Sequence, residues 1–123
     1  MLELWTLGVL AFMAAILWLI FMAIALAIVY QMWLFDCLVR WEYEHRREQW
    51  ERDGKPSGFY WRPKECVFWL SNSAMHRLAW AFIFKTPDWV AERPECRRWL
   101  ALMRITSLIG ILGIFSVIGV LIR

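Results

Sequence analysis

The chain has 123 residues, of which 61% are hydrophobic and ten are tryptophan. A soluble domain of this length has too little interior to bury so much apolar surface, so the composition excludes a soluble globular protein and indicates a lipid environment. The formal net charge is only +3, but thirteen of the fourteen basic and ten of the eleven acidic residues lie between two apolar segments. We therefore expect an all-α membrane protein with two transmembrane helices joined by a charged segment.

The first apolar segment contains no charged side chain from Leu4 to Phe35, a run of thirty-two residues. About 20 apolar residues in a helix already cross the hydrocarbon core of a bilayer. The run is longer than the apolar region of a signal peptide and lacks a basic leader and a cleavage site, which favours a retained span. We expect residues 1–35 to form the first transmembrane helix, with an interfacial extension around Trp33.

The connecting segment, residues 36–104, should begin as a continuation of this helix and turn at Gly54 and Pro56. A further helix is predicted at about residues 65–85, and Arg77 near its middle disfavours a third span. We expect this helix to be amphipathic and to lie in the membrane interface with its polar face toward the cytoplasm, a third or re-entrant span being the alternative. The residues that share the polar face are Trp69, Asn72, Ser73, His76, Arg77 and Trp80.

The second transmembrane helix is expected at residues 105–123, as the end of a helix that begins at Pro94 and contains no later proline. Small residues recur in it at every third position and permit close approach of another helix, although glycine and serine are also common in membrane helices generally. This spacing drifts by about 60° per step, so the strip winds around the helix and suits a crossing partner. The strip is Ser107, Gly110, Gly113, Ser116 and Gly119, and Gly8, Ala11 and Ala15, with Ala23 and Ala27 further along, could receive it in a hairpin.

Basic residues flank the inner ends of both apolar segments, which predicts a cytoplasmic connecting segment and termini on the opposite, periplasmic side. Arginine beside tryptophan at a bilayer surface can pair with anionic headgroups while the indole ring stays in the interface. Three cysteines on the cytoplasmic side should remain reduced. The residues expected at the membrane interface are Trp33, Trp41, Trp69, Trp80, Trp99, Arg40, Arg77 and Arg104.

The sequence carries no catalytic signature. The two histidines, His45 and His76, have no cysteine at a metal-ligand spacing, and neither apolar segment holds an ionisable residue that could relay protons or couple ions. Ten acidic residues in the connecting segment would repel a nucleic-acid backbone. We therefore expect no enzyme activity, no catalytic residue, no metal, no cofactor and no nucleic-acid partner.

The order of the parts resembles the universal stress protein B family of small bacterial inner-membrane proteins. The resemblance rests on Asp53, Gly54 and the sequence Gly58-Phe59-Tyr60, and on Glu95-Cys96-Arg97-Arg98 before the last span with Ser107. It implies a bacterial inner membrane and a stress-linked accessory role without a defined reaction.

Together these features predict a non-enzymatic accessory or regulatory subunit of a bacterial inner-membrane complex. Its partners would be the lipid bilayer, including anionic headgroups, and a larger membrane protein or a second copy of the chain. Two alternatives stay open. One is a self-assembling, holin-like or pore-forming protein, and the other is a small anchor subunit of a quinone- or haem-containing membrane enzyme, with the group beside Trp80 and His76.

Overall fold

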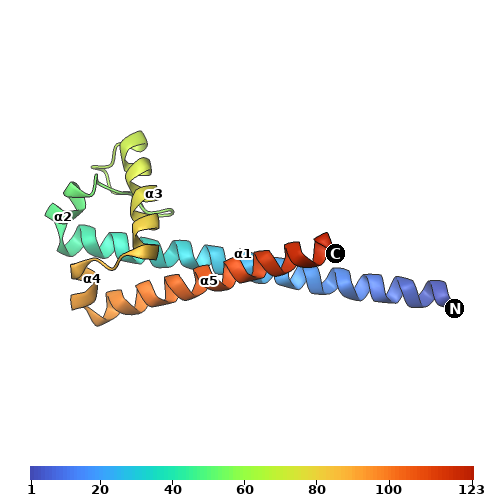
Figure 1. Ribbon diagram of the computed structural model, residues 1–123. Coiled ribbons are helices and arrows are strands. Elements are labelled where there is room, and N and C mark those ends of the chain that lie inside the picture. The colour runs from blue at the N-terminus through green and yellow to red at the C-terminus, as the bar shows by residue number, and fades with distance from the viewer.

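The computed structural model describes residues 1–123 as five helices without a strand: α1 (Leu2–His45), α2 (Arg47–Arg52), α3 (Phe68–Phe84), α4 (Asp88–Glu92) and α5 (Pro94–Ile122). The helices α1 and α5 lie side by side, and the shorter helices gather at one end of this pair (Figure 1). Both α1 and α5 are long and apolar enough to cross a membrane. The expectation of an all-helical chain with two such helices is confirmed.

The first helix is longer than the apolar run that predicts it. It continues without interruption past Asp36 to His45, 44 residues in all, because no glycine or proline intervenes and the charged residues that follow are good helix formers. It breaks at Arg46, whose backbone leaves the helical region at φ −131° and ψ 57°. The sequence predicts one continuous helix as far as Asp53, so this break, after which α2 changes direction, is a difference from the expectation.

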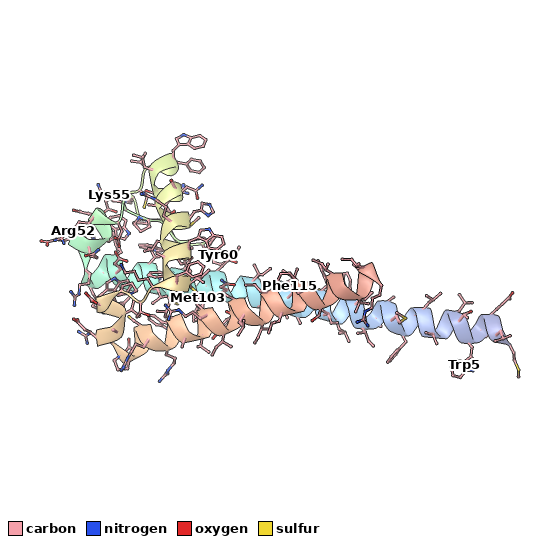
Figure 2. The ribbon with its side chains drawn as sticks, in the orientation of Figure 1. Trp5, Arg52, Lys55, Tyr60, Met103 and Phe115 are labelled. Carbon is pink, nitrogen blue, oxygen red and sulfur yellow. The ribbon has the colours of Figure 1, made fainter.

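Two contacts, at different positions along the helices, set the register between α1 and α5. The Gln31 Nε2 donates to the Ser107 Oγ at 2.6 Å, and the Cβ position of Gly113 lies 3.3 Å from the Ile24 side chain. In this register the N-terminal part of α1 extends beyond the end of α5 (Figure 1). Trp5 and Phe115 project outward from the two helices (Figure 2) and are exposed, as lipid-facing side chains would be.

The buried core lies at the opposite end, in a unit that we call the cap: residues 34–104, which contain α2, α3, α4 and the adjoining ends of α1 and α5. Trp50 is fully buried there and donates its indole N–H to the Pro56 carbonyl at 2.9 Å. The Phe35 and Phe82 rings meet at 5.7 Å and link α1 to α3. The largest fully buried hydrophobic side chains of this core are Trp50, Phe35, Phe82, Leu34, Leu38, Met103, Val39 and Val90.

The helix α3 stands at a steep angle to α1 and α5 (Figure 1). Met75 and Phe82 are buried against the rest of the cap, whereas Phe68 and Leu70 are exposed. The apolar residues of α3 are thus divided between the core of the protein and its surface, because the loop before the helix and the end of α1 cover only one side of it.

Candidate functional site

The Asp36 carboxylate ties the loop after α2 to α1. Its Oδ1 accepts the backbone N–H of Phe59 at 2.6 Å, and its Oδ2 accepts those of Tyr60 at 2.7 Å and Trp61 at 3.1 Å. Burial raises the pKa of Asp36, and the three N–H donors oppose that rise, because hydrogen bonds to the charged form favour it. We call this arrangement the Asp36 clamp.

Glycine is required beside the clamp. A Cβ atom at Gly58 would lie within 2.8 Å of three atoms of the Asp36 carboxyl group. This is closer than van der Waals contact allows, so a residue with a side chain would displace Asp36. The Gly58 N–H also donates to the Trp61 carbonyl at 2.8 Å and closes the loop on itself. The sequence identifies residues 58–61 as an aromatic turn but gives no sign that Asp36 binds it, because the contact joins positions more than twenty residues apart.

The turn before the clamp packs against α3. Gly54 has φ +94°, a left-handed conformation that favours glycine. A Cβ atom there would lie 3.1 Å from the Ala74 Cβ and 3.3 Å from the Arg77 Nη2. The turn therefore connects the end of α2 to the middle of α3 through a close backbone approach.

Glu42 is buried in the cap, seven residues beyond the apolar run of α1. Its side chain is 0% exposed and neither carboxyl oxygen has a hydrogen-bond partner. Burial, followed by the neighbouring Asp53 carboxyl group, raises its pKa to about 10. The hydroxyl groups of Ser57 and Ser71 are also buried without partners. In the sequence Glu42 is one of ten acidic residues of the connecting segment, and only the packing of the cap reveals its burial.

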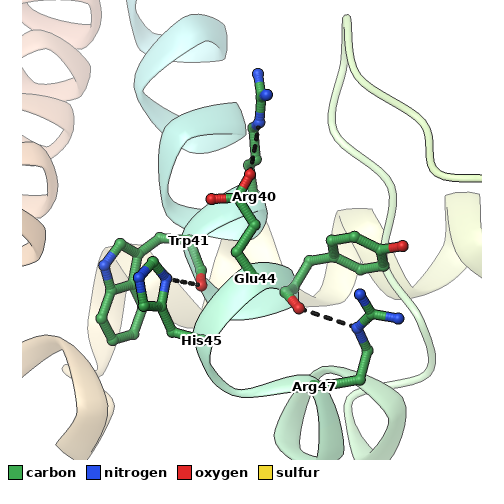
Figure 3. Close-up of polar contacts among 6 residues, drawn as sticks. Arg40, Trp41, Glu44, His45 and Arg47 are labelled. Atoms are coloured by element: carbon green, nitrogen blue, oxygen red, sulfur yellow. Dashed lines mark hydrogen bonds and ion pairs between the residues drawn. The ribbon is translucent and has the colours of Figure 1, made fainter.

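An aromatic stack connects the end of α1 to α4. The Trp41 ring centroid lies 5.3 Å from that of Trp89 with an interplanar angle of 6°, and the His45 ring also stacks on Trp41, with the centroids 4.5 Å apart. Figure 3 shows this pair, with the His45 Nδ1 3.1 Å from the Trp41 carbonyl oxygen. Trp41 is only 8% exposed, so its ring lies inside the cap, whereas the sequence places it at the lipid interface.

The other residues expected at the interface are three exposed tryptophans, one half-buried tryptophan and three arginines. Trp33, Trp69 and Trp80 are exposed, and Trp99 is half-buried beside the core. The arginines also contact the protein: Arg40 pairs with Glu44 at 3.1 Å (Figure 3), Arg77 reaches the turn at Gly54, and Arg104 donates to the Phe82 carbonyl oxygen at 3.1 Å and to the Thr86 Oγ1 at 3.0 Å. Arg104 thereby fastens α5 to the end of α3.

The small-residue strip of α5 is divided by the register of the helices. Ser107, Gly110 and Gly113 are half-buried, while Ser116 and Gly119 are exposed. The half-buried residues of α1 before Leu34 are Leu17, Ile20, Ile24, Ala25, Ala27, Gln31 and Met32. The winding of the strip explains this division, because a three-residue spacing leaves the contact face after a few steps.

Most of the residues of α1 expected to receive the strip lie elsewhere: of the five, Ala27 is half-buried and Ala23 is exposed. Gly8, Ala11 and Ala15 are exposed, and nothing lies within 4 Å of a Cβ atom at Gly8. Contacts through Gln31 and Ile24 set the two helices so that Gly8 lies in the part of α1 beyond the end of α5. Within one chain, these three small residues do not receive the strip.

Two hollows interrupt the surface along the long helices. An open groove between α1 and α5, of about 760 Å³, is lined only by apolar side chains, among them Leu17, Phe21 and Ile118. A smaller cavity of about 180 Å³ lies where α1, α3 and α5 meet, with Gln31 as the polar residue of its wall. The apolar walls of both hollows suit hydrocarbon chains. No polar side chain lines the groove, so it has no group that could orient a substrate.

The chemistry available in the cap is limited. No group of three or more histidine, cysteine or acidic residues is arranged to hold a metal ion. The three cysteines are unpaired, and burial raises the pKa of the Cys96 thiol to about 11, which makes it a poor nucleophile at neutral pH. The remaining candidate surface is the outer face of α3, where Trp69 is 78% and Trp80 64% exposed.

Comparison with known proteins adds no further assignment. No protein-family model, curated protein or solved structure matches this chain.

Proposed function

We propose that the protein is a non-enzymatic accessory or regulatory subunit of a bacterial inner-membrane complex. In this proposal α1 and α5 cross the membrane as a hairpin, and the cap presents the outer face of α3 to a larger membrane protein. The observation that carries the proposal is the exposure of large aromatic side chains on α3, whose other side is buried through Ala74, Met75 and Phe82. The exposed residues are Phe68, Trp69, Leu70, Trp80 and Phe84.

The way in which the cap is built supports a binding role. Phe82 of α3 is held by three different elements: its carbonyl oxygen accepts from Arg104 of α5, and its ring packs on those of Phe35 in α1 and Trp89 in α4. A surface held in one conformation loses little entropy when it binds. Exposed apolar patches rimmed by polar groups mark sites of protein or membrane interaction, and the rim here includes Asn72, Ser73 and Arg77.

The orientation of α3 is also consistent with contact at the membrane surface. If α1 crosses the bilayer near the normal, the steep angle between the helices places α3 close to the membrane plane (Figure 1). Arg52 and Lys55 lie at the end of the molecule away from the N-terminus (Figure 2), where the positive-inside rule expects the cytoplasm. The link to a stress response rests on the family resemblance alone.

The proposal is tested by purifying the tagged full chain from native membranes in mild detergent or nanodiscs. We expect a larger membrane protein to accompany it in fixed ratio. The double variant Trp69→Ala, Trp80→Ala should lose at least tenfold of that partner, whereas Trp5→Ala, which removes an exposed tryptophan near the N-terminus of α1, should retain it.

Repeated isolation of the chain alone, or equal retention by both variants, would contradict the proposal. A dye-leakage assay with the purified protein in liposomes addresses a self-assembling pore, for which leakage is the positive result. An absorbance spectrum of the same preparation would reveal haem and so favour an enzyme subunit.

A further inference from the structure

Glu42 is the most unusual side chain in the cap. It is fully buried on the α1 face that meets the end of α2, and both of its oxygens lack a partner. A buried polar group without a hydrogen bond is rare in folded proteins and calls for an explanation. The function proposed above makes no use of this carboxyl group.

The charged groups around Glu42 do not compensate it. Asp53, at the end of α2, is the ionisable group that acts on Glu42: its carboxylate can accept a hydrogen bond from the protonated Glu42 side chain, and it carries the same sign of charge once Glu42 is ionised. From α3, the Arg77 guanidinium reaches Gly54, next to Asp53, but Arg77 is exposed and makes no ion pair with Glu42. On α1 itself, Glu44 and Arg40 pair with each other at the exposed surface.

An ionised carboxylate in this position would be strongly unfavourable. Burying a charge without a partner is far more costly than burying the neutral acid, so such a group takes up a proton instead. The pKa of about 10 that burial and Asp53 give Glu42 agrees with this reasoning. At neutral pH the side chain is therefore a neutral carboxylic acid.

We propose that the proton on Glu42 controls the cap: with the proton bound, the turn at residues 53–58 packs on α1 and α3, and loss of the proton releases this turn. The turn contacts α3 through Gly54 and Ala74, so its release also loosens the hold on the outer face of α3. The geometry that supports this inference is the buried, unpartnered carboxyl group facing the like charge of Asp53. The inference concerns regulation of the cap and does not depend on the identity of a partner.

The protonation state is tested by infrared spectroscopy of the full chain in nanodiscs. At pH 7 we expect a carbonyl band of a protonated carboxylic acid that shifts in heavy water and is absent from Glu42→Gln. Glu44→Gln, which changes an exposed carboxylate on the same helix, should keep the band. Absence of a Glu42-dependent band would overturn the proposal, as would its removal by millimolar Mg²⁺ or Ca²⁺, which would show that the site takes a cation.

The opening of the turn is tested by limited proteolysis with subtilisin, with cleavage within residues 53–58 read by mass spectrometry. Relative to Glu42→Gln at the same pH, the natural chain should be cleaved at least tenfold faster at pH 9 than at pH 7, because its open form holds fewer protons than its closed form. Parallel pH courses for the two chains would overturn the proposal.

A second variant keeps the test decisive should Glu42→Gln fold poorly. Asp53→Asn removes the like charge and lowers the pKa of Glu42. The rise in cleavage should therefore level off at a lower pH than in the natural chain. An unchanged course would contradict the role assigned to the pair.

Discussion

Asp36→Asn should release the loop from α1 while leaving the two long helices in place. The asparagine keeps one oxygen that can accept the N–H of Phe59, but places an NH₂ group where the Oδ2 accepts those of Tyr60 and Trp61. Hydrogen bonds to charged groups contribute about 1.5–3 kcal/mol each, and Asp36 is 7% exposed. Loss of two such bonds should destabilise the cap by about 3–6 kcal/mol.

For a domain of this size each kcal/mol shifts the melting temperature by about 4 °C. We therefore expect cap unfolding, followed by tryptophan fluorescence and near-ultraviolet circular dichroism in detergent, to occur about 12–24 °C lower. The far-ultraviolet signal of α1 and α5 should change little, because their contacts with each other do not involve Asp36. The matched control is Glu51→Gln, which alters an exposed carboxylate that makes no hydrogen bond. Equal melting of the two variants would refute the clamp.

Three further changes test other parts of the structure. Gly58→Ala should destabilise the cap to a similar degree as Asp36→Asn, and the double variant should be little worse than either, because both disrupt one contact. Gly113→Ile should force α5 away from α1 and lower thermal stability in detergent, whereas Gly119→Ile, at an exposed position, should not. Glu42→Gln should gain stability over the natural chain by roughly 1.4 kcal/mol per pH unit between about pH 5 and pH 10. The sign follows because the contribution of a raised pKa is full below the ordinary value of 4.5 and is lost as the pH rises through about 10. Denaturation curves at pH 6 and pH 9 measure this difference, and a constant difference would contradict it.

The long helices could be predicted because hydropathy is a local property. The charge-free run ending at Phe35 and the proline-free stretch after Pro94 each specify a helix without reference to the rest of the chain. The break at Arg46 could not be predicted, because the residues on both sides of Arg46 have good helix propensity. It follows instead from the packing of Trp50, which brings α2 back onto the cap.

The cap shows the opposite case, because its contacts join distant residues. Trp41 reads as an interfacial residue next to Arg40, yet its ring stacks on Trp89 inside the protein. Nothing in the neighbourhood of Trp41 identifies a partner 48 positions away in the chain. The small-residue strip was only partly informative, because periodicity gives the winding of a face but not the register at which Ser107 meets Gln31.

The two acidic residues on the inner side of α1 show how the loop can serve both as a fixed support and as a movable part. Asp36 is bound by three backbone N–H groups at one end of the loop, whereas Glu42, six residues later, is buried without a partner beside the other end. Deprotonation of Glu42 would therefore release residues 53–58 first, while the clamp still holds residues 59–61 on α1. The loop would open at one end about a fixed anchor, and α3 would lose its contact at Ala74 but keep that of Phe82 with Phe35. If deprotonation of Glu42 acts on the exposed face of α3, it should do so by loosening the Phe68 end of the helix, while the Phe84 end remains attached.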